Sequence, residues 1–575
     1  MGTISDKLMR IINTKEDIRQ ALISKGYDVP TSIPFKEYAK MILDLPCRVD
    51  SFPDIEGIVA RYSALGLTNE QMAENPIWKD LTGNGHDLQM KNFAWKGMSG
   101  VGGYTENYDS NKWYKVASRI DATWTYKSFN VKSIKDNNFA QLFYQSQSSD
   151  TGFRVLSCTI KVSGLTDGQG IEYISNGTQP TVIMRIENDG IYHLPSFDFG
   201  AKNAYYGFRF LKLQESCNIT IEQLPLYPGA LVFDGVDDYG TCDNFPILTK
   251  EKGYTVVALR QYLVDKSTAY LTANGDSISN TSFILEGNNY RDTWSFGKAT
   301  TIQASRILAT QTSKQYDGVK LNIGTNTEGS NLLQVGKWSK SYSNVAIWEL
   351  VFLDHDATEE ELTKIKDYFV KTYPWLFPDQ AWTVTGKTNE DEDRATIANI
   401  TGNGNDLVLS NFGFAEGSGY NEEGEYAGYL VTDGVDDMIT SSAFNIGKDF
   451  TIVGDWKFID NKKSGTGLVK GSSFYIYNTM IGLDLYINSG SVKNSLDGIK
   501  SINAACSDGR AYDRNWNEIL ANTGNVVGSG GILEVSSSGG RFDRIAFKNL
   551  AIYPRILSKD DCIKAYNYLQ TLKAK

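Results

Sequence analysis

Histidine, cysteine and proline are all scarce in this chain of 575 residues, which contains three, six and 13 of them respectively. Three histidines are too few for a histidine-rich metal centre, and they do not indicate a histidine-based catalytic triad. The six cysteines form no Cys-x-x-Cys pair. We therefore expect free thiols in a reducing compartment.

Long apolar runs and blocks of like charge are also missing. No stretch of 18 consecutive apolar residues occurs, so the sequence predicts no membrane insertion. The first residues, MGTISDKLMRIINTKED, carry charges every few positions, and we expect no signal peptide. The net charge is −11, with acidic and basic residues interspersed. This pattern argues against a nucleic-acid-binding face and against an anchor to anionic membranes.

Glycine and aromatic residues are abundant instead. The chain has 53 glycines, and aromatic side chains make up 12% of it. Together with clusters of Ser, Thr, Asn and Asp, they favour short strands joined by turns. The length predicts three to five domains at roughly 150 residues each.

Three sequence landmarks occur twice, in the same order, which indicates an internal repeat. Each has a local meaning: two tight turns, and then an apolar strand followed by a helix. The landmarks are TGNG at 82–85 and 401–404, DGVDD at 234–238 and 433–437, and the strand and helix at 345–369 and 545–569.

The spacing of the landmarks reveals an insertion in the first copy. DGVDD precedes the strand by 111 residues in the first copy and by 112 in the second. TGNG precedes DGVDD by 152 residues in the first copy and by only 32 in the second. About 120 extra residues are typical of a domain placed in a surface loop. We place this domain at 105–227, where runs such as RVLSCTIKVSG and AYYGFRFLKL predict a β-sandwich or jelly roll.

The third landmark predicts a central strand and a capped helix. VAIWELVF is apolar on both faces, as a strand in the middle of a sheet would be. The helix after it opens with Thr358 and Glu361, a capping-box pattern, and the second copy repeats it with Ser558 and Asp561. An apolar stripe is predicted from Leu362, Ile365 and Phe369. Cys562 stands where Leu362 stands, so we expect it in the core.

The repeated pattern of TGNG-x-DL, DGVDD, strand and capped helix resembles the laminin-G-like, concanavalin A-like jelly roll. The resemblance implies a mainly β fold with two such sandwiches, one carrying an inserted β-sandwich similar to a carbohydrate-binding module. A short α-helical segment would precede them. The predicted domains are 1–48, 49–104 plus 228–376, 105–227 for the insertion, and 377–575.

The first 48 residues predict three short amphipathic helices. Their segment TKEDIRQALISKGYDVPTSIPFKEYAKMI resembles the start of phage and prophage appendage proteins, including those of crAss-like and other Bacteroides phages. The resemblance implies a virion protein, assembled in the cytoplasm of the host bacterium and attached through this segment to capsid or tail proteins. It also implies a homodimer or homotrimer. The attachment or oligomer face would comprise Ile4, Leu8, Ile11, Ile18, Leu22, Phe35, Tyr38 and Ile42.

The sequence does not indicate catalysis. Glycoside hydrolases that share this sandwich carry an E-x-D-x-E or E-x-D-x-x-E strand, whose paired carboxylates lie on one face. This chain has no such strand, and its nearest acidic cluster, NEDEDR at 389–394, is predicted to be a solvated loop. We therefore expect that the protein is not an enzyme and requires no cofactor.

Two kinds of ligand remain open. Ca²⁺ takes carboxylate and carbonyl oxygens, although turn formation explains DGVDD equally well. Glycans need aromatic faces, although most aromatic residues of a sandwich lie in its core. The candidate metal ligands are Asp234, Asp237, Asp238, Asp433, Asp436 and Asp437. The candidate glycan-binding residues are Trp95, Trp113, Trp124, Tyr205 and Tyr206.

These observations lead us to expect a structural phage appendage, a head or tail fibre whose outer domains adhere to surface polysaccharides of the host or to mucus. A virion depolymerase that degrades such polysaccharides is the first alternative. A decorative capsid-bound protein without a ligand is the second.

Overall fold

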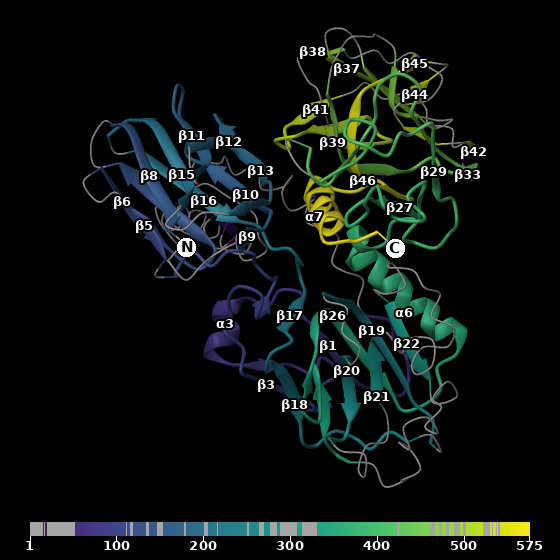
Figure 1. The fold of residues 1–575 in the computed structure, drawn as a ribbon. Coiled ribbons are helices and arrows are strands. Elements are labelled where there is room, and N and C mark those ends of the chain that lie inside the picture. The colour runs from purple at the N-terminus through teal and green to yellow at the C-terminus, as the bar shows by residue number, and fades with distance from the viewer. Residues whose placement is uncertain are drawn as a thin grey trace, which may run out of the picture. The chain divides into compact units, whose positions relative to one another are not determined.

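A computed structural model gives the fold of the chain (Figure 1). The chain forms two compact units, one of Met1–Glu56 with Thr358–Tyr373 and one of Gly57–Ala357 with Pro374–Lys575. The structure describes Lys15, Ile18, Arg19 and residues 52–574 except 111, 116–118, 134–136, 146–152, 177–179, 200–204, 216, 250–251, 264–268, 277–283, 288–307, 313–329, 423–425, 460–465, 471–473, 479–481, 488–494, 498–501, 521–529, 532, 536 and 539–540.

The predicted fold class is confirmed: the described chain is mainly β, with two sandwiches of the concanavalin A-like type and a third sandwich inserted in the first. Strands from 113–223 pair only with one another in the described part, and so do strands from 380–553. Each group encloses a hydrophobic core of its own. The residue boundaries of the domains remain a prediction.

The first sandwich consists of two six-stranded sheets. In one, β26 pairs with β1, β17 and β19, as expected for the central strand. Its Leu350 is fully buried, which contributes about 1.5–3 kcal/mol. This sheet comprises β1 (Ile58–Ser63), β4 (Gly100–Val101), β17 (Leu231–Asp234), β19 (Thr255–Tyr262), β22 (Leu308–Thr312) and β26 (Asn344–Leu353). The other comprises β2 (Ile77–Trp78), β3 (Leu88–Lys91), β18 (Tyr239–Cys242), β20 (Ala269–Asn274), β21 (Ile284–Gly287) and β23 (Leu333–Val335), and β24 (Lys337–Trp338) pairs with β25 (Ser341–Tyr342).

The inserted sandwich has two five-stranded antiparallel sheets. Aromatic residues from both sheets fill its core; the rings of Phe129 and Phe208 lie 6.1 Å apart. One sheet has the order β13 (Gly190–Leu194), β10 (Cys158–Ser163), β16 (Asn218–Gln223), β7 (Ser128–Ser133) and β6 (Ile120–Trp124). The other has the order β12 (Pro180–Ile186), β11 (Gly170–Asn176), β15 (Tyr205–Leu213), β8 (Asn137–Gln145) and β5 (Trp113–Lys115), and β9 (Phe153–Val155) pairs with β14 (Phe197–Phe199).

The second sandwich repeats the first with two eight-stranded sheets. Its central strand is β46 (Ile545–Tyr553), which pairs with β27 (Gln380–Thr383), β31 (Tyr429–Val431) and β34 (Thr451–Phe458). β30 (Gly419–Asn421), β39 (Ile502–Cys506), β40 (Arg510–Asp513) and β41 (Glu518–Leu520) complete that sheet. The other contains β28 (Thr396–Ile397), β29 (Leu407–Ser410), β32 (Met438–Ser441), β43 (Glu534–Val535), β35 (Thr466–Lys470), β36 (Phe474–Asn478), β37 (Gly482–Ile487) and β38 (Ser495–Asp497). Two-stranded pairs are β33 (Phe444–Asn445) with β42 (Gly530–Gly531) and β44 (Ser537–Ser538) with β45 (Arg541–Phe542).

The two copies also share an irregularity of their central strands. The pairing of β19 with β26 shifts register after Leu259, and the pairing of β34 with β46 shifts after Asp455. These residues face Glu349 and Asn549, which occupy equivalent places in the repeat. A bulge kept in both copies indicates that it belongs to the fold rather than to one sequence.

The two helices that follow the central strands have the N-terminal caps that the sequence predicts. The helices are α3 (Asn69–Glu74), α6 (Glu359–Thr372), α7 (Lys559–Gln570) and the 3₁₀ turn η3 (Pro374–Leu376). Thr358 and Glu361 form the full capping box of α6, and the Ser558 side chain accepts from the Asp561 amide in α7. Cys562 is buried, as expected, whereas Leu362 of the predicted stripe is only half-buried.

Most of the predicted N-terminal helices lie outside the described residues. Of the expected attachment face, only Ile18 is described; it is helical and half-buried. Ile4, Leu8, Ile11, Leu22, Phe35, Tyr38 and Ile42 fall outside. None of the helices in the described ranges is long and apolar enough to cross a bilayer. The five cysteines within those ranges are free thiols.

Candidate functional site

Each DGVDD segment forms a tight turn that its own aspartates hold together. Asp234 Oδ1 accepts from the amides of Val236 and Asp237, at 2.7 and 3.4 Å. Asp238 Oδ2 accepts from the Asp234 amide at 3.0 Å, and Asp238 Oδ1 accepts from Ser99 Oγ at 3.0 Å. Asp433, Asp437 and Ser418 repeat these bonds in the second copy. The motif is therefore a structural turn in both copies.

These bonds bear directly on the calcium prediction. The carboxylates of Asp234, Asp237 and Asp238 come within 4.8 Å of one another, as do those of Asp433, Asp436 and Asp437. However, one carboxylate oxygen of Asp234 and both of Asp238 already accept hydrogen bonds from backbone amides and a serine hydroxyl, and the second copy repeats this arrangement. Burial raises the pKa of Asp238 to about 7 and that of Asp437 to about 6. Calcium binding remains a prediction that the geometry does not strengthen.

The aromatic glycan candidates lie in or against cores. Trp113 and Tyr206 are only 4% and 3% exposed, because strand alternation turns both rings inward. Trp124 and Tyr205 are half-buried in the same sandwich, and Trp95 stacks on Phe93 at 4.7 Å in the first sandwich. None of the five lines either cavity described below.

A buried carboxylate of the inserted sandwich has a shifted pKa. Tyr206 Oη donates to the Glu106 carboxylate at 3.0 and 3.1 Å, and burial raises the pKa of Glu106 to about 7. A carboxylate with that pKa is suited to general acid–base chemistry. The Tyr206 hydroxyl is enclosed in the core, however, and neither described cavity reaches it. We read the pair as a structural hydrogen bond.

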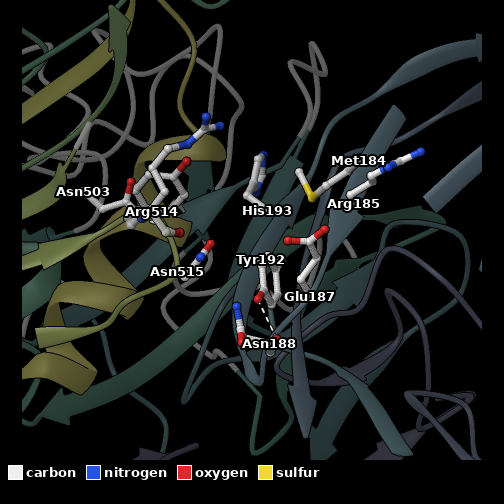
Figure 2. A pocket seen from close by; sticks show the side chains of 10 residues that line it. Met184, Arg185, Glu187, Asn188, Tyr192, His193, Asn503, Arg514 and Asn515 are labelled. Carbon is white, nitrogen blue, oxygen red and sulfur yellow. Dashed lines mark hydrogen bonds between the residues drawn. The ribbon is translucent and has the colours of Figure 1, made fainter. Parts of the chain in front are cut away.

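A polar cavity of about 320 Å³ lies between the inserted sandwich and the second sandwich (Figure 2). It is within the size range of ligand sites in proteins. Three carboxamides, two guanidinium groups, one carboxylate and two phenol rings contribute to its walls. We call it the interdomain cavity; it is lined by Met184, Arg185, Glu187, Asn188, Tyr192 and His193 of the inserted sandwich and by Asn503, Arg514, Asn515 and Tyr566 of the second.

An aspartate fixes the loop on each side of the interdomain cavity. In the turn between β12 and β13, Asp189 accepts from the amides of Gly164 and Leu165, at 2.9 and 2.8 Å. In the turn between β40 and β41, Asp513 Oδ1 accepts from the amides of Asn515 and Asn517, both at 2.8 Å. The backbone of each loop is therefore held in place before a ligand arrives.

The Tyr192 ring stands next to the first of these loops. It is buried, and its hydroxyl donates to the Asn188 carbonyl at 2.6 Å (Figure 2). The hydrogen bond fixes the backbone from which the exposed Asn188 side chain projects. On the opposite side, Asn503 Nδ2 donates to the Arg514 carbonyl at 3.3 Å.

A hydrogen-bond chain joins the two sandwiches next to His193 of the interdomain cavity. Thr159 Oγ1 donates to Asn567 Oδ1 at 2.7 Å and lies 3.2 Å from His193 Nδ1. Because the threonine hydroxyl has one proton, His193 Nδ1 must donate to it, which leaves Nε2 as the acceptor. His193 Nε2 is enclosed and has no partner. Burial, with Lys548 nearby, lowers the pKa of His193 to about 3, so the ring is neutral near pH 7.

A second cavity of about 430 Å³ opens at the ends of three adjacent strands of the inserted sandwich. It shares Arg185 and Glu187 with the interdomain cavity. We call it the strand-end cavity; its other lining residues are Gly168, Gln169, Gly170, Ile171, Glu172, Ile186, Leu211 and Lys212.

The sequence interpretation missed both cavities. Their residues come from loops and strand ends that carry no spacing pattern, and the interdomain cavity joins positions more than 300 residues apart. The one local signal was the pair of turn sequences Asp189-Gly190 and Asp513-Arg514-Asn515, which mark loops but not their meeting.

Comparisons with known proteins give only a distant likeness. No family model and no curated protein matches the chain. Trypanosoma rangeli sialidase in complex with sialic acid aligns over 81% of this chain and 85% of its own, at 9% identity and a TM-score of 0.24. The binding domain of botulinum neurotoxin DC in complex with SialylT aligns over 87% and 99%, at 8% identity and a TM-score of 0.15. At such scores the likeness supports no conclusion about this chain.

Proposed function

We propose that this protein is a glycan-binding phage appendage and that the interdomain cavity is its binding site. The observation that carries the proposal is the set of groups around that cavity. Asn188, Asn503 and Asn515 supply planar amides that both donate and accept, while Arg185 and Arg514 supply forked donors. Such groups match the paired hydroxyls and ring oxygens of sugars, and the phenol rings offer apolar surface.

Binding rather than cleavage fits the acidic groups of this cavity. Hydrolysis by the usual glycosidase mechanism needs two carboxyl groups across the scissile bond, about 5–10 Å apart. Glu187 is the one carboxylate among the lining residues, and it is exposed. The absence of enzyme activity remains a prediction. Incubation with capsular polysaccharide should release no new reducing ends; their appearance would favour the depolymerase alternative.

Binding is tested on a glycan array, followed by calorimetry with the glycans retained. Asn188→Ala should weaken binding about tenfold, equivalent to about 1.4 kcal/mol, because it removes one amide from the cavity wall while keeping the backbone carbonyl that Tyr192 uses. Asn218→Ala is the matched control: this asparagine is also exposed on the inserted sandwich and lines neither cavity. Equal affinities of the two variants would remove the cavity from the proposal, and a protein that binds no glycan would favour the decorative alternative.

The virion part of the proposal rests on the resemblance of the first 48 residues to phage appendage proteins. A chain lacking residues 1–48 should keep glycan binding and lose incorporation into particles. Western blotting of purified virions measures incorporation. Truncated protein at normal levels in those particles would disprove the attachment role while leaving glycan binding intact.

A further inference from the structure

The two cavities are neighbours on one strand end. Arg185 and Glu187 line both cavities, and they lie two positions apart, so an extended backbone would place them on one face. Arg185 is the penultimate residue of β12, and Glu187 opens the loop toward Asn188. A molecule that leaves the interdomain cavity past these two side chains therefore enters the strand-end cavity.

A row of charges across three strands holds Arg185 in place. Glu172 of β11 faces Arg185 of β12 on one side and Arg209 of β15 on the other. The Glu172 carboxylate pairs with Arg185 Nε at 2.9 Å and accepts a hydrogen bond from Arg209 Nε at 2.6 Å. Only 2% of the Glu172 side chain is exposed. The Arg185 side chain nevertheless remains 66% exposed. It is thus anchored through Nε while much of its surface faces solvent.

The far end of the strand-end cavity has features of its own. Lys212 lines it with a backbone φ of +51°, in the left-handed region that costs a non-glycine residue about 1–2 kcal/mol. Gly168 and Gly170 also line this cavity, and Gly170 pairs with Leu211, the residue before Lys212. The exposed Lys212 ammonium provides hydrogen-bond donors for a second part of a polar ligand.

We infer that the glycan bound by this protein is an extended oligosaccharide that occupies both cavities and crosses the ridge formed by Arg185 and Glu187. The inference rests on the proposed glycan-binding function and adds the size class of the ligand. A single sugar fills one cavity and gains nothing from the other. A linear chain makes contacts at Asn515, on the ridge, and at Lys212.

The test uses the full chain and an array that carries homologous series, from disaccharide to octasaccharide, of linear glucans, xylans, mannans, N-acetylglucosamine oligomers and hyaluronan. For a series that binds, affinity should rise at least tenfold with length and then level off. Lys212→Asn, which tolerates the left-handed backbone, should remove most of that gain for the octasaccharide and leave the disaccharide bound at the interdomain cavity unchanged.

The outcomes separate the two proposals. Equal affinity for short and long members, or a length gain that survives both Lys212→Asn and Arg185→Ala, would overturn the extended ligand while the glycan-binding function stands. Absence of binding to every series would overturn both. Circular dichroism and thermal melting of the variants show whether a loss of affinity reflects misfolding, and Lys161→Ala, an exposed lysine of β10 that lines neither cavity, serves as the control.

Discussion

At the residue scale, the DGVDD aspartates and Trp113 have their contacts within the fold. The aspartates of DGVDD are of the residue type that binds metals, and Asp234 Oδ1 and Asp238 Oδ2 accept hydrogen bonds from the turn itself, as do their counterparts in the second copy. Trp113 was a reasonable glycan candidate, yet it packs in an aromatic core. Sequence identifies the chemical type of a residue, while its partners depend on neighbours that are distant along the chain.

The Asp238 carboxyl group should make the stability of its turn depend on pH. Its folded pKa of about 7 lies above the unfolded value of about 4, so the folded protein binds the proton more tightly. The contribution of this carboxyl group to the free energy of unfolding therefore falls as the pH rises from about 4 to about 7. The total fall is at most about 4 kcal/mol, and the contribution is constant above about pH 7. Asp238→Asn should remove that fall, since its amide can still accept from the Asp234 amide and donate to Ser99.

Hydrogen exchange of the peptide spanning β17 and β18, at pH 4 to 8, measures the effect as an opening free energy. The opening free energy of Asp238→Asn should rise relative to that of the natural protein as the pH rises. Asp237→Asn, which removes an exposed charge from the same turn and leaves Asp238 in place, is the control and should show a much smaller trend. A constant difference between Asp238→Asn and the natural protein at every pH would contradict the prediction.

At the element scale, strands and caps were predictable and the cavities were not. The central strand β26, the capping box at Thr358 and the buried Cys562 all follow from periodicity and short-range spacing. The interdomain cavity depends on the β12–β13 and β40–β41 turns, whose positions are set by the packing of two sandwiches. No periodic signal along the chain encodes that packing.

The β40–β41 turn provides a prediction for a loop that is ordered before binding. Asp513→Ala removes the acceptor for the Asn515 and Asn517 amides, so the loop that carries Arg514 must become ordered when a glycan binds. Calorimetry should show about tenfold weaker binding, with a change in stability within about 1 kcal/mol. Asp508→Ala is the matched control, because this aspartate also accepts a hydrogen bond from a backbone amide, that of Arg510, in a turn that carries no residue lining either cavity. Equal losses of glycan affinity in Asp513→Ala and Asp508→Ala would contradict the prediction that the β40–β41 loop is ordered before binding.

At the scale of the whole molecule, a buried hydrogen bond joins the inserted sandwich to the second sandwich. Thr159 on β10 and Asn567 on α7 lie 408 residues apart in sequence and share a buried hydrogen bond. A bond of this kind fixes the relative placement of the walls of the interdomain cavity. Its loss should therefore affect binding as well as local stability.

A double-mutant cycle tests that link. Thr159→Val and Asn567→Leu each leave a buried polar partner without its bond, at a cost of about 1–3 kcal/mol. The double variant should lose less than the sum of the single losses, by about 1 kcal/mol, because both polar groups are gone. Hydrogen exchange of β10 and α7 measures the opening free energies. Strict additivity would show that the two residues do not act on each other.

The pairing of β1 with β26 has a consequence for the order of events during synthesis. The ion pair between Arg61 and Glu349 joins positions 288 residues apart, and the inserted sandwich lies wholly between them. At about 5–20 residues per second, a ribosome needs roughly 15–60 s to make that stretch. The inserted sandwich leaves the ribosome complete while its host still lacks a central strand. The inserted sandwich can thus fold before the first sandwich, whose sheet is completed only after the inserted domain has formed.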